Sequence, residues 1–144
     1  MLENNRKYTD IVSMFFTSLQ CLSPFSRSDD QAKSLETRTL AGRRRLHVAK
    51  YPEALNTPIQ GTGGDGIKLA LARLYEIRYR CPTAQLVACI HDELVVEAPR
   101  ADADQVVRWV EEMMVWAMDE IVGGAVRIEV ETQIAKDWAG TPLE

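Results

Sequence analysis

Residues 85–98, QLVACIHDELVVEA, carry the clearest structural signal in this sequence. Residues 85–90 and 93–98 are short runs rich in apolar and β-branched side chains. Only His91-Asp92 separates them, as expected for a β-hairpin. His-Asp is not one of the residue pairs that two-residue hairpin turns favour, such as Asn-Gly. The tip residues therefore indicate a role other than forming the turn.

The hairpin tip concentrates polar chemistry in the triplet His91-Asp92-Glu93. Neighbouring carboxylates on a strand point to opposite faces, but a tight turn can aim Asp92 and Glu93 in one direction. Mg²⁺ prefers oxygen ligands and binds through one or two protein carboxylates together with substrate phosphates. The tip is a candidate metal site, and an exposed polar turn is the alternative interpretation of such a triplet.

The segments around the hairpin predict the rest of the fold. Residues 102–122 carry a wide apolar stripe at helical spacing, and Gly123-Gly124 ends that helix. Residues 126–134 then alternate between apolar and polar side chains, as in a half-buried strand. With a further helix before the hairpin, the order is helix, hairpin, helix, strand. This order predicts an α+β fold in which two helices back one face of a small antiparallel β-sheet.

The helix before the hairpin is predicted to begin at Thr62, because Thr62 and Asp65 have the spacing of a capping box. It runs to about Arg80. Residues 56–66, which contain four glycines and Pro58, are predicted to be a loop. A glycine-rich turn at a helix start can cradle a phosphate, and a helix start that needs backbone freedom explains the glycines equally well.

The N-terminal part is predicted to lie outside the main domain. Apolar residues over 7–19 recur at helical spacing and predict a helix, and the polar stretch 26–33 predicts a connection. Residues 1–35 are therefore interpreted as a divergent helical leader and linker, and residues 36–144 as the folded domain. Within that domain, Arg43-Arg44-Arg45 is followed by the alternation of a short strand.

Composition bounds the class of protein. The 144 residues are 46% apolar and 26% charged, which suits one globular domain and excludes a disordered chain or a disulfide-rich miniprotein. The three cysteines show no Cys-x-x-Cys spacing, so we expect reduced thiols and a cytoplasmic location. No apolar run is long enough to span a membrane, and the N-terminus lacks the pattern of a signal peptide.

Charge is unevenly distributed along the chain. The net charge is −4, but residues 1–80 carry a net charge of +5 and residues 81–144 a net charge of −9. This division suits a protein that holds a polyanion on one side and metal ions on the other, and chance clustering is the alternative. The guanidinium forks of Arg43-Arg44-Arg45 suit phosphate oxygens, although an ordinary solvated basic face would have the same composition.

Four stretches, in order, resemble the motifs of family A DNA polymerases, the bacterial DNA polymerase I type. NTPIQGTGGDGIK at 56–68 is similar to the family's N-x-P-x-Q-G-T-x-x-D-x-x-K motif, and VACIHDELV at 87–95 is similar to its motif C hairpin. TLAGRR at 39–44 resembles the T-x-x-G-R-R run, and residues 130–138 resemble the end of these enzymes. The resemblance implies that residues 36–144 form the C-terminal part of a polymerase palm.

The same resemblance implies catalytic roles at the hairpin tip. Asp92 would be a catalytic carboxylate that binds metal, and Glu93 beside it would support catalysis and metal binding. His91 would lie near the primer 3′ end. Template-directed nucleotidyl transfer would follow a two-metal mechanism. One Mg²⁺ would activate the primer 3′ hydroxyl, and the other would hold the triphosphate and the leaving group.

DNA-binding roles are implied for four further residues. Asn56 and Gln60 would touch the primer–template on its minor-groove side, and Arg43 and Arg44 would contact the DNA backbone. Contacts with the backbone position a duplex without reading its sequence. The implied partners are primer–template DNA and a deoxynucleoside triphosphate (dNTP), and no membrane is involved.

The sequence departs from the family in features that concern activity. It has neither the motif A run with the second catalytic aspartate nor the fingers helix whose Lys and Arg grip the triphosphate. A two-metal Mg²⁺ site would need an aspartate from outside this chain, for example from an upstream polymerase fragment. We therefore expect the chain alone to be inactive. The alternatives are a non-catalytic DNA-binding or split-polymerase subunit, and an unrelated Mg²⁺-dependent phosphohydrolase that uses Asp92 and Glu93.

Overall fold

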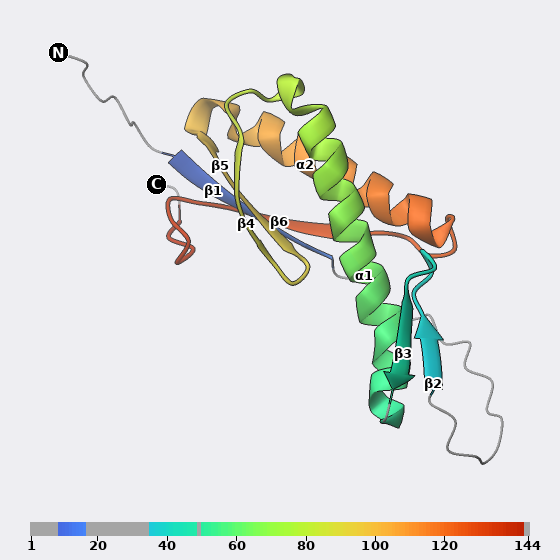
Figure 1. Ribbon diagram of the computed structural model, residues 1–144. Coiled ribbons are helices and arrows are strands. Elements are labelled where there is room, and N and C mark those ends of the chain that lie inside the picture. The colour runs from blue at the N-terminus through green and yellow to red at the C-terminus, as the bar shows by residue number, and fades with distance from the viewer. Residues whose placement is uncertain (1–8, 17–34, 49, 143–144) are drawn as a thin grey trace.

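A computed structural model describes residues 9–16, 35–48 and 50–142. Its larger sheet has four antiparallel strands in the order β4-β5-β1-β6 (Figure 1). These strands are β1 (Thr9–Phe16), β4 (Gln85–Ile90), β5 (Glu93–Pro99) and β6 (Val130–Ala135). β4 and β5 form the predicted hairpin, while β1 lies between β5 and β6 and pairs with both.

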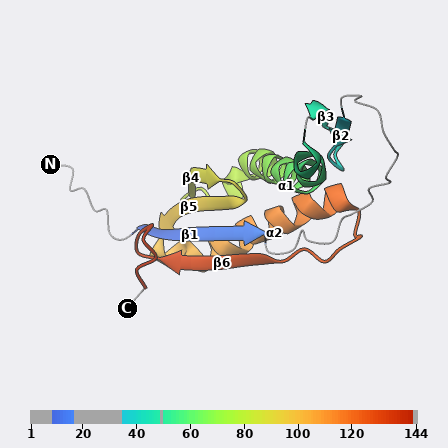
Figure 2. The same cartoon turned by 90° about the horizontal axis from the view of Figure 1, so that it is seen from below.

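Two α-helices cover one face of this sheet. The helical segments are α1 (Tyr51–Glu76), the 3-10 turn η1 (Arg78–Arg80), the 3-10 turn η2 (Arg100–Asp102) and α2 (Ala103–Val122). α2 contacts β5, β1 and β6, so it lies across the sheet, and α1 packs against α2 (Figure 2). Leu74 of α1, Met114 of α2 and Leu94 of β5 are fully buried in the core between these elements. Within the described ranges, no helix has the length and apolar character needed to cross a membrane.

A separate two-stranded antiparallel sheet, the β2–β3 ribbon (residues 35–48), lies against α1. Its strands are β2 (Leu35–Arg38) and β3 (Arg44–Val48), and both contact α1 (Figure 1). The pairing of the two strands shifts register, and His47, in the irregular part of β3, has a left-handed φ of 56°. The ribbon brings the arginine run of the sequence beside the first half of α1.

Several predicted elements are confirmed. The hairpin occupies the predicted residues, and α2 covers nearly all of the predicted helix over 102–122. Gly123 follows α2 with a left-handed φ of 64°, as its role in ending the helix requires. The last strand is shorter than predicted and begins at Val130. The architecture is α+β, with small antiparallel sheets and two helices, as the sequence predicts.

The predicted helix over 7–19 is wrong, because Thr9–Phe16 is the strand β1. β1 has an interior position in the sheet and pairs along its length with strands that lie far away in the sequence. A short segment rich in apolar residues can match helical spacing as well as a strand, and periodicity alone does not distinguish the two. The predicted connection over 26–33 lies outside the described residues, and the division of the chain at residue 35 stays a prediction.

The predicted loop over 56–66 and the predicted helix start at Thr62 are also wrong. α1 begins at Tyr51, with Pro52 in its first turn, where a proline removes no helical hydrogen bond. The glycine-rich stretch lies in the middle of this helix. Its N–H groups therefore do not form a phosphate cradle at a helix start, since such a cradle needs the unpaired N–H groups of a first turn.

Contacts with the β2–β3 ribbon stabilise the helix where its own sequence is unfavourable. Pro58 has no N–H to offer the carbonyl of Ala54, one turn earlier, and the Thr37 hydroxyl donates to that carbonyl at 3.3 Å. The Thr62 hydroxyl donates to the Pro58 carbonyl and accepts a hydrogen bond from the Leu40 N–H at 3.1 Å. Thr62 is therefore a buried tie between helix and ribbon instead of a helix cap.

Two of the glycines in α1 allow other elements to approach the helix closely. A Cβ at Gly61 would lie 2.5 Å from the Cγ2 atom of Thr39, and a Cβ at Gly66 would overlap the sulfur of Met118. Separations this short require something to move. Close packing thus explains Gly61, against the ribbon, and Gly66, against α2.

Candidate nucleic-acid interface

A groove of about 510 Å³ lies between the β2–β3 ribbon and the first half of α1. The four residues predicted to bind DNA all line it: Asn56 and Gln60 from α1, and Arg43 and Arg44 from the ribbon. Asn56 and Gln60 are exposed and four positions apart, so they share one face of the helix. The complete lining is Thr39, Arg43, Arg44, Arg45, Glu53, Asn56, Thr57, Gln60 and Gly61.

Arg43 is held against the helix by two hydrogen bonds. Its Nε donates to the Oδ1 atom of Asp65 at 2.8 Å, and its Nη2 donates to the Gly61 carbonyl at 2.9 Å. The Asp65 side chain is only 12% exposed, whereas that of Arg43 is 52% exposed, so the pair joins a shielded carboxylate to an open guanidinium. A guanidinium has more N–H donors than these two bonds use. Arg43 can therefore keep its orientation and still donate to a ligand in the groove.

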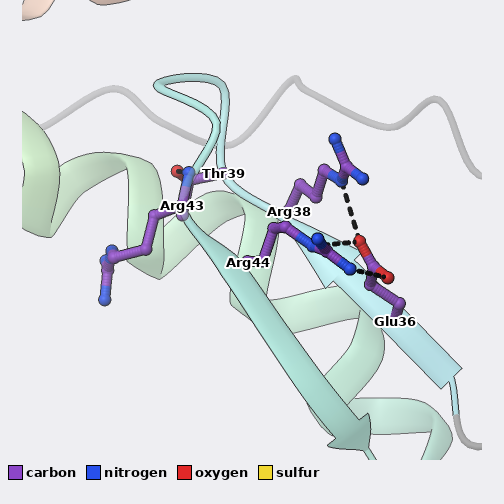
Figure 3. A network of polar contacts seen from close by, with 5 residues as sticks. All are labelled: Glu36, Arg38, Thr39, Arg43 and Arg44. Atoms are coloured by element: carbon purple, nitrogen blue, oxygen red, sulfur yellow. Dashed lines mark hydrogen bonds and ion pairs between the residues drawn. The ribbon is translucent and has the colours of Figure 1, made fainter.

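Arg44 extends away from Arg43, toward Glu36 on β2 (Figure 3). Its Nε and Nη2 donate to the two carboxylate oxygens of Glu36, both at 2.7 Å, and Nε of Arg38 donates to one of them at 2.9 Å. The two hydrogen bonds from Arg44, and then the one from Arg38, lower the pKa of the Glu36 carboxyl. Glu36 in turn raises the pKa of Arg44. The two predicted DNA-binding arginines thus differ, because the fork of Arg44 is already occupied by a carboxylate.

Arg45, the third residue of the arginine run whose guanidinium groups suit phosphate, also lines the groove. Its Nη1 donates to the Thr57 hydroxyl at 3.2 Å, and its Nη2 donates to the Glu53 carboxylate at 3.3 Å. No motif or charge run in the sequence indicates that Glu36 belongs to the site.

The hairpin tip carries the predicted catalytic residues. His91 has a left-handed φ of 57°, a conformation that few non-glycine residues adopt, and it lies in the turn between β4 and β5. His91 and Asp92 are exposed, and Glu93 is half-buried at the start of β5. In Figures 1 and 2 the tip of the hairpin points toward the end of the molecule that carries the β2–β3 ribbon. None of the three residues lines the groove.

Asp92 and Glu93 offer carboxylate oxygens, which are the ligands that Mg²⁺ prefers. Across residues 9–16, 35–48 and 50–142, however, no group of three His, Cys, Asp or Glu side chains is placed to hold a metal ion. Asp10 of β1 pairs with Ala98, five residues beyond Glu93 in β5. Its backbone therefore lies roughly 17 Å along the strand from the tip. The described residues fit only part of a metal site.

Comparison with known proteins identifies the family. The sequence matches DNA polymerase family A over residues 10–140. It is 37% identical over 111 residues to the thermostable DNA polymerase I of Thermus caldophilus. This alignment covers 69% of this chain and 13% of that protein. It is also 38% identical over 102 residues to DNA polymerase I of Aquifex aeolicus, and that alignment covers 69% of this chain and 17% of the Aquifex protein.

A solved structure agrees with these matches. The fold is similar to the POL domain of Pol1 from M. smegmatis, in complex with a DNA primer-template and dNTP, with a TM-score of 0.60 and 26% sequence identity. The similarity covers 74% of this chain and 20% of that one. The chain spans only a small part of each relative, but the family match extends over most of its own length. It belongs to DNA polymerase family A.

Proposed function

We propose that this chain forms a part of a polymerase palm that holds primer–template DNA in the groove and presents Asp92, Glu93 and His91 toward the primer end. The observation that carries the proposal is the groove itself. It brings together Asn56 and Gln60 of α1 with Arg43 and Arg44 of the ribbon, although these two pairs come from separate segments of the sequence. Family membership supports the same function, because the matching solved structure is a complex with DNA primer-template and dNTP.

The side chains of the groove suit binding that is independent of base sequence. Arginine forks donate to phosphate oxygens, and such contacts fix the register of a duplex without reading it. Asn56 and Gln60 have amide groups that both donate and accept hydrogen bonds. The minor groove presents acceptors at every base pair, so amides there distinguish base pairs poorly. A polymerase has to bind every sequence it copies, and this arrangement meets that requirement.

At the hairpin, we propose that Asp92 is the catalytic carboxylate that holds Mg²⁺, with Glu93 as a supporting ligand and His91 beside the primer 3′ end. Bound Mg²⁺ would stabilise the charges of the transferring phosphate. The second aspartate that a two-metal site needs would come from elsewhere, such as an upstream polymerase fragment. A cytoplasmic compartment suits this role, since Cys89 is exposed as a free thiol.

Two assays test this function. Fluorescence anisotropy with a labelled primer–template duplex should show salt-dependent binding, as expected when arginines replace the counterions of DNA. Primer extension with Mg²⁺ and dNTPs should give no product with the chain alone. Extension by the chain alone that is abolished in Asp92→Ala would contradict the proposed incompleteness. Absence of duplex binding at low salt would contradict the proposal as a whole.

A non-catalytic DNA-binding subunit is the second candidate. Two observations favour a binding role without catalysis. The groove is assembled from two elements, whereas among the described residues the hairpin offers only part of a metal site. An upstream fragment with motif A and the fingers helix distinguishes the two functions. Restored primer extension that depends on Asp92 supports the split polymerase, and duplex binding without restored extension supports the binding subunit. The family match argues against an unrelated phosphohydrolase.

A further inference from the structure

Two arginines face each other across the β2–β3 ribbon, with a carboxylate between them. Arg38 and Arg44 are direct partners in the strand register. Like charges in such positions repel each other. The Glu36 carboxylate compensates for this, since it accepts two hydrogen bonds from Arg44 at 2.7 Å and one from Arg38 at 2.9 Å (Figure 3).

The geometry of this cluster is that of a site for a two-oxygen anion with one negative charge. Arg44 meets both oxygens side by side, as guanidinium forks do with carboxylates and phosphates alike. A phosphodiester has two non-bridging oxygens and one negative charge, so it matches the carboxylate in charge and in the number of acceptors. We propose that Glu36 occupies, in the free protein, the place that a backbone phosphate of bound nucleic acid takes between Arg38 and Arg44.

Exposure distinguishes this carboxylate from the one that holds Arg43. The side chains of Arg38 and Arg44 are 61% and 53% exposed, and that of Glu36 is 34% exposed. Ion pairs as open as these contribute little to stability, so an incoming phosphate can compete for the arginines. Asp65, at 12% exposed, is a fixed partner of Arg43. Asp65 and Glu36 therefore act differently, and a ligand can displace Glu36 from its arginines.

The position of the cluster connects it to the proposed DNA surface. Arg44 lines the groove and also belongs to the cluster, so the cluster borders the proposed DNA surface. The inference rests on the proposed DNA binding and extends it. Glu36 weakens binding because each contact with Arg44 must first displace its carboxylate. The groove then binds DNA less tightly than its arginine content alone would allow.

The test compares two variants that remove the same charge. Glu36→Gln keeps the shape of the side chain without its charge, and Glu76→Gln does the same at another exposed ion pair, with Arg73, at the far end of α1. Anisotropy titrations with the labelled duplex should show that Glu36→Gln binds about three-fold more tightly than the wild-type chain. Glu76→Gln should bind within experimental error of the wild type. In an Arg44→Ala background, the gain from Glu36→Gln should be smaller, because only the Glu36–Arg38 pair remains to be released.

Each result has a distinct meaning. Unchanged or weaker duplex binding by Glu36→Gln, with its thermal unfolding unaltered, would overturn the inference and leave DNA binding intact. An equal gain in Glu76→Gln would overturn it by showing that net charge alone matters. Failure of the wild type and all variants to bind duplex would overturn the proposed function and the inference with it.

Inorganic phosphate, titrated against the Arg44 Nε–H signal in NMR, should bind more weakly than the duplex. Equal binding would overturn the assignment to nucleic acid.

Discussion

The Nε atom of Arg43 donates to the Asp65 carboxylate at 2.8 Å, which joins a groove arginine to a carboxylate in the middle of α1. Because Asp65 is fixed on the helix and Arg43 also donates to the Gly61 carbonyl, the guanidinium has one defined orientation at the groove wall. Its two bonds leave further N–H groups for a ligand. Arg43 is thus the pre-oriented cation of the proposed DNA site.

Arg43→Lys tests this orientation. A lysine keeps the charge, but its single nitrogen cannot bond Asp65 and Gly61 in a planar fork while it donates to DNA. We expect duplex affinity to fall about ten-fold, or roughly 1.4 kcal/mol, in anisotropy titrations. Arg108→Lys, at an exposed position of α2 outside the groove lining, is the matched control and should bind as the wild type does. Equal affinity of Arg43→Lys and wild type would show that charge alone suffices.

Gly66→Ala should destabilise the fold. The added methyl group overlaps the sulfur of Met118, so α1 and α2 must move apart or Met118 must change rotamer. We expect a loss of roughly 1–3 kcal/mol in the free energy of unfolding, measured by urea denaturation. Gly64→Ala is the control, since its Cβ would lie 3.9 Å from Nη2 of Arg43, an ordinary contact. Its helix propensity should stabilise the chain slightly. Equal stabilities of the two variants would contradict the close approach at Gly66.

Thr62→Val tests the tie between α1 and the β2–β3 ribbon. Valine has nearly the same shape, but it leaves the Leu40 N–H without its acceptor and the Pro58 carbonyl without its hydroxyl donor. Unfolding should become easier by roughly 1–3 kcal/mol, because part-buried polar groups lose their partners. Thr132→Val, at an exposed position of β6, should change stability by less than about 0.5 kcal/mol. If both variants unfold alike, the tie contributes nothing.

Local signals in the sequence predict the elements that depend on local chemistry. The hairpin and α2 follow from alternation, helical periodicity and the glycine at the end of α2, and all of these agree with the fold. β1 is not predicted, because only pairing with β5 and β6 distinguishes its apolar run from a helix. The start of α1 is missed because Pro58 and the glycines disfavour a helix locally. The partners that compensate, Thr37 and Met118, come from distant segments.

The candidate site likewise has features that nearby residues determine and features that depend on contacts between distant segments. Motif similarity predicts the residue types of the groove, and the structure brings Asn56, Gln60, Arg43 and Arg44 to one surface. The sequence does not predict that Arg43 and Arg44 have different carboxylate partners. That difference depends on the register of β2 against β3, which places Glu36 within reach of Arg44, and on the helical position of Asp65.

The acid titration of Glu36 should report on its arginine partners directly. Its pKa is lowered by hydrogen bonds from Arg44 and then from Arg38, so Arg44→Ala should raise it more than Arg38→Ala does. Because the folded-state pKa lies below the ordinary value, these contacts stabilise the ribbon above the ordinary carboxyl pKa. Their contribution is lost as the pH falls through the lowered pKa. Carboxyl ¹³C shifts followed by NMR measure this titration. Asp137, whose pKa is lowered by the Thr141 hydroxyl and N–H, should titrate unchanged in both variants. If Arg44→Ala left the titration of Glu36 unaltered, the bidentate pair would not persist in solution.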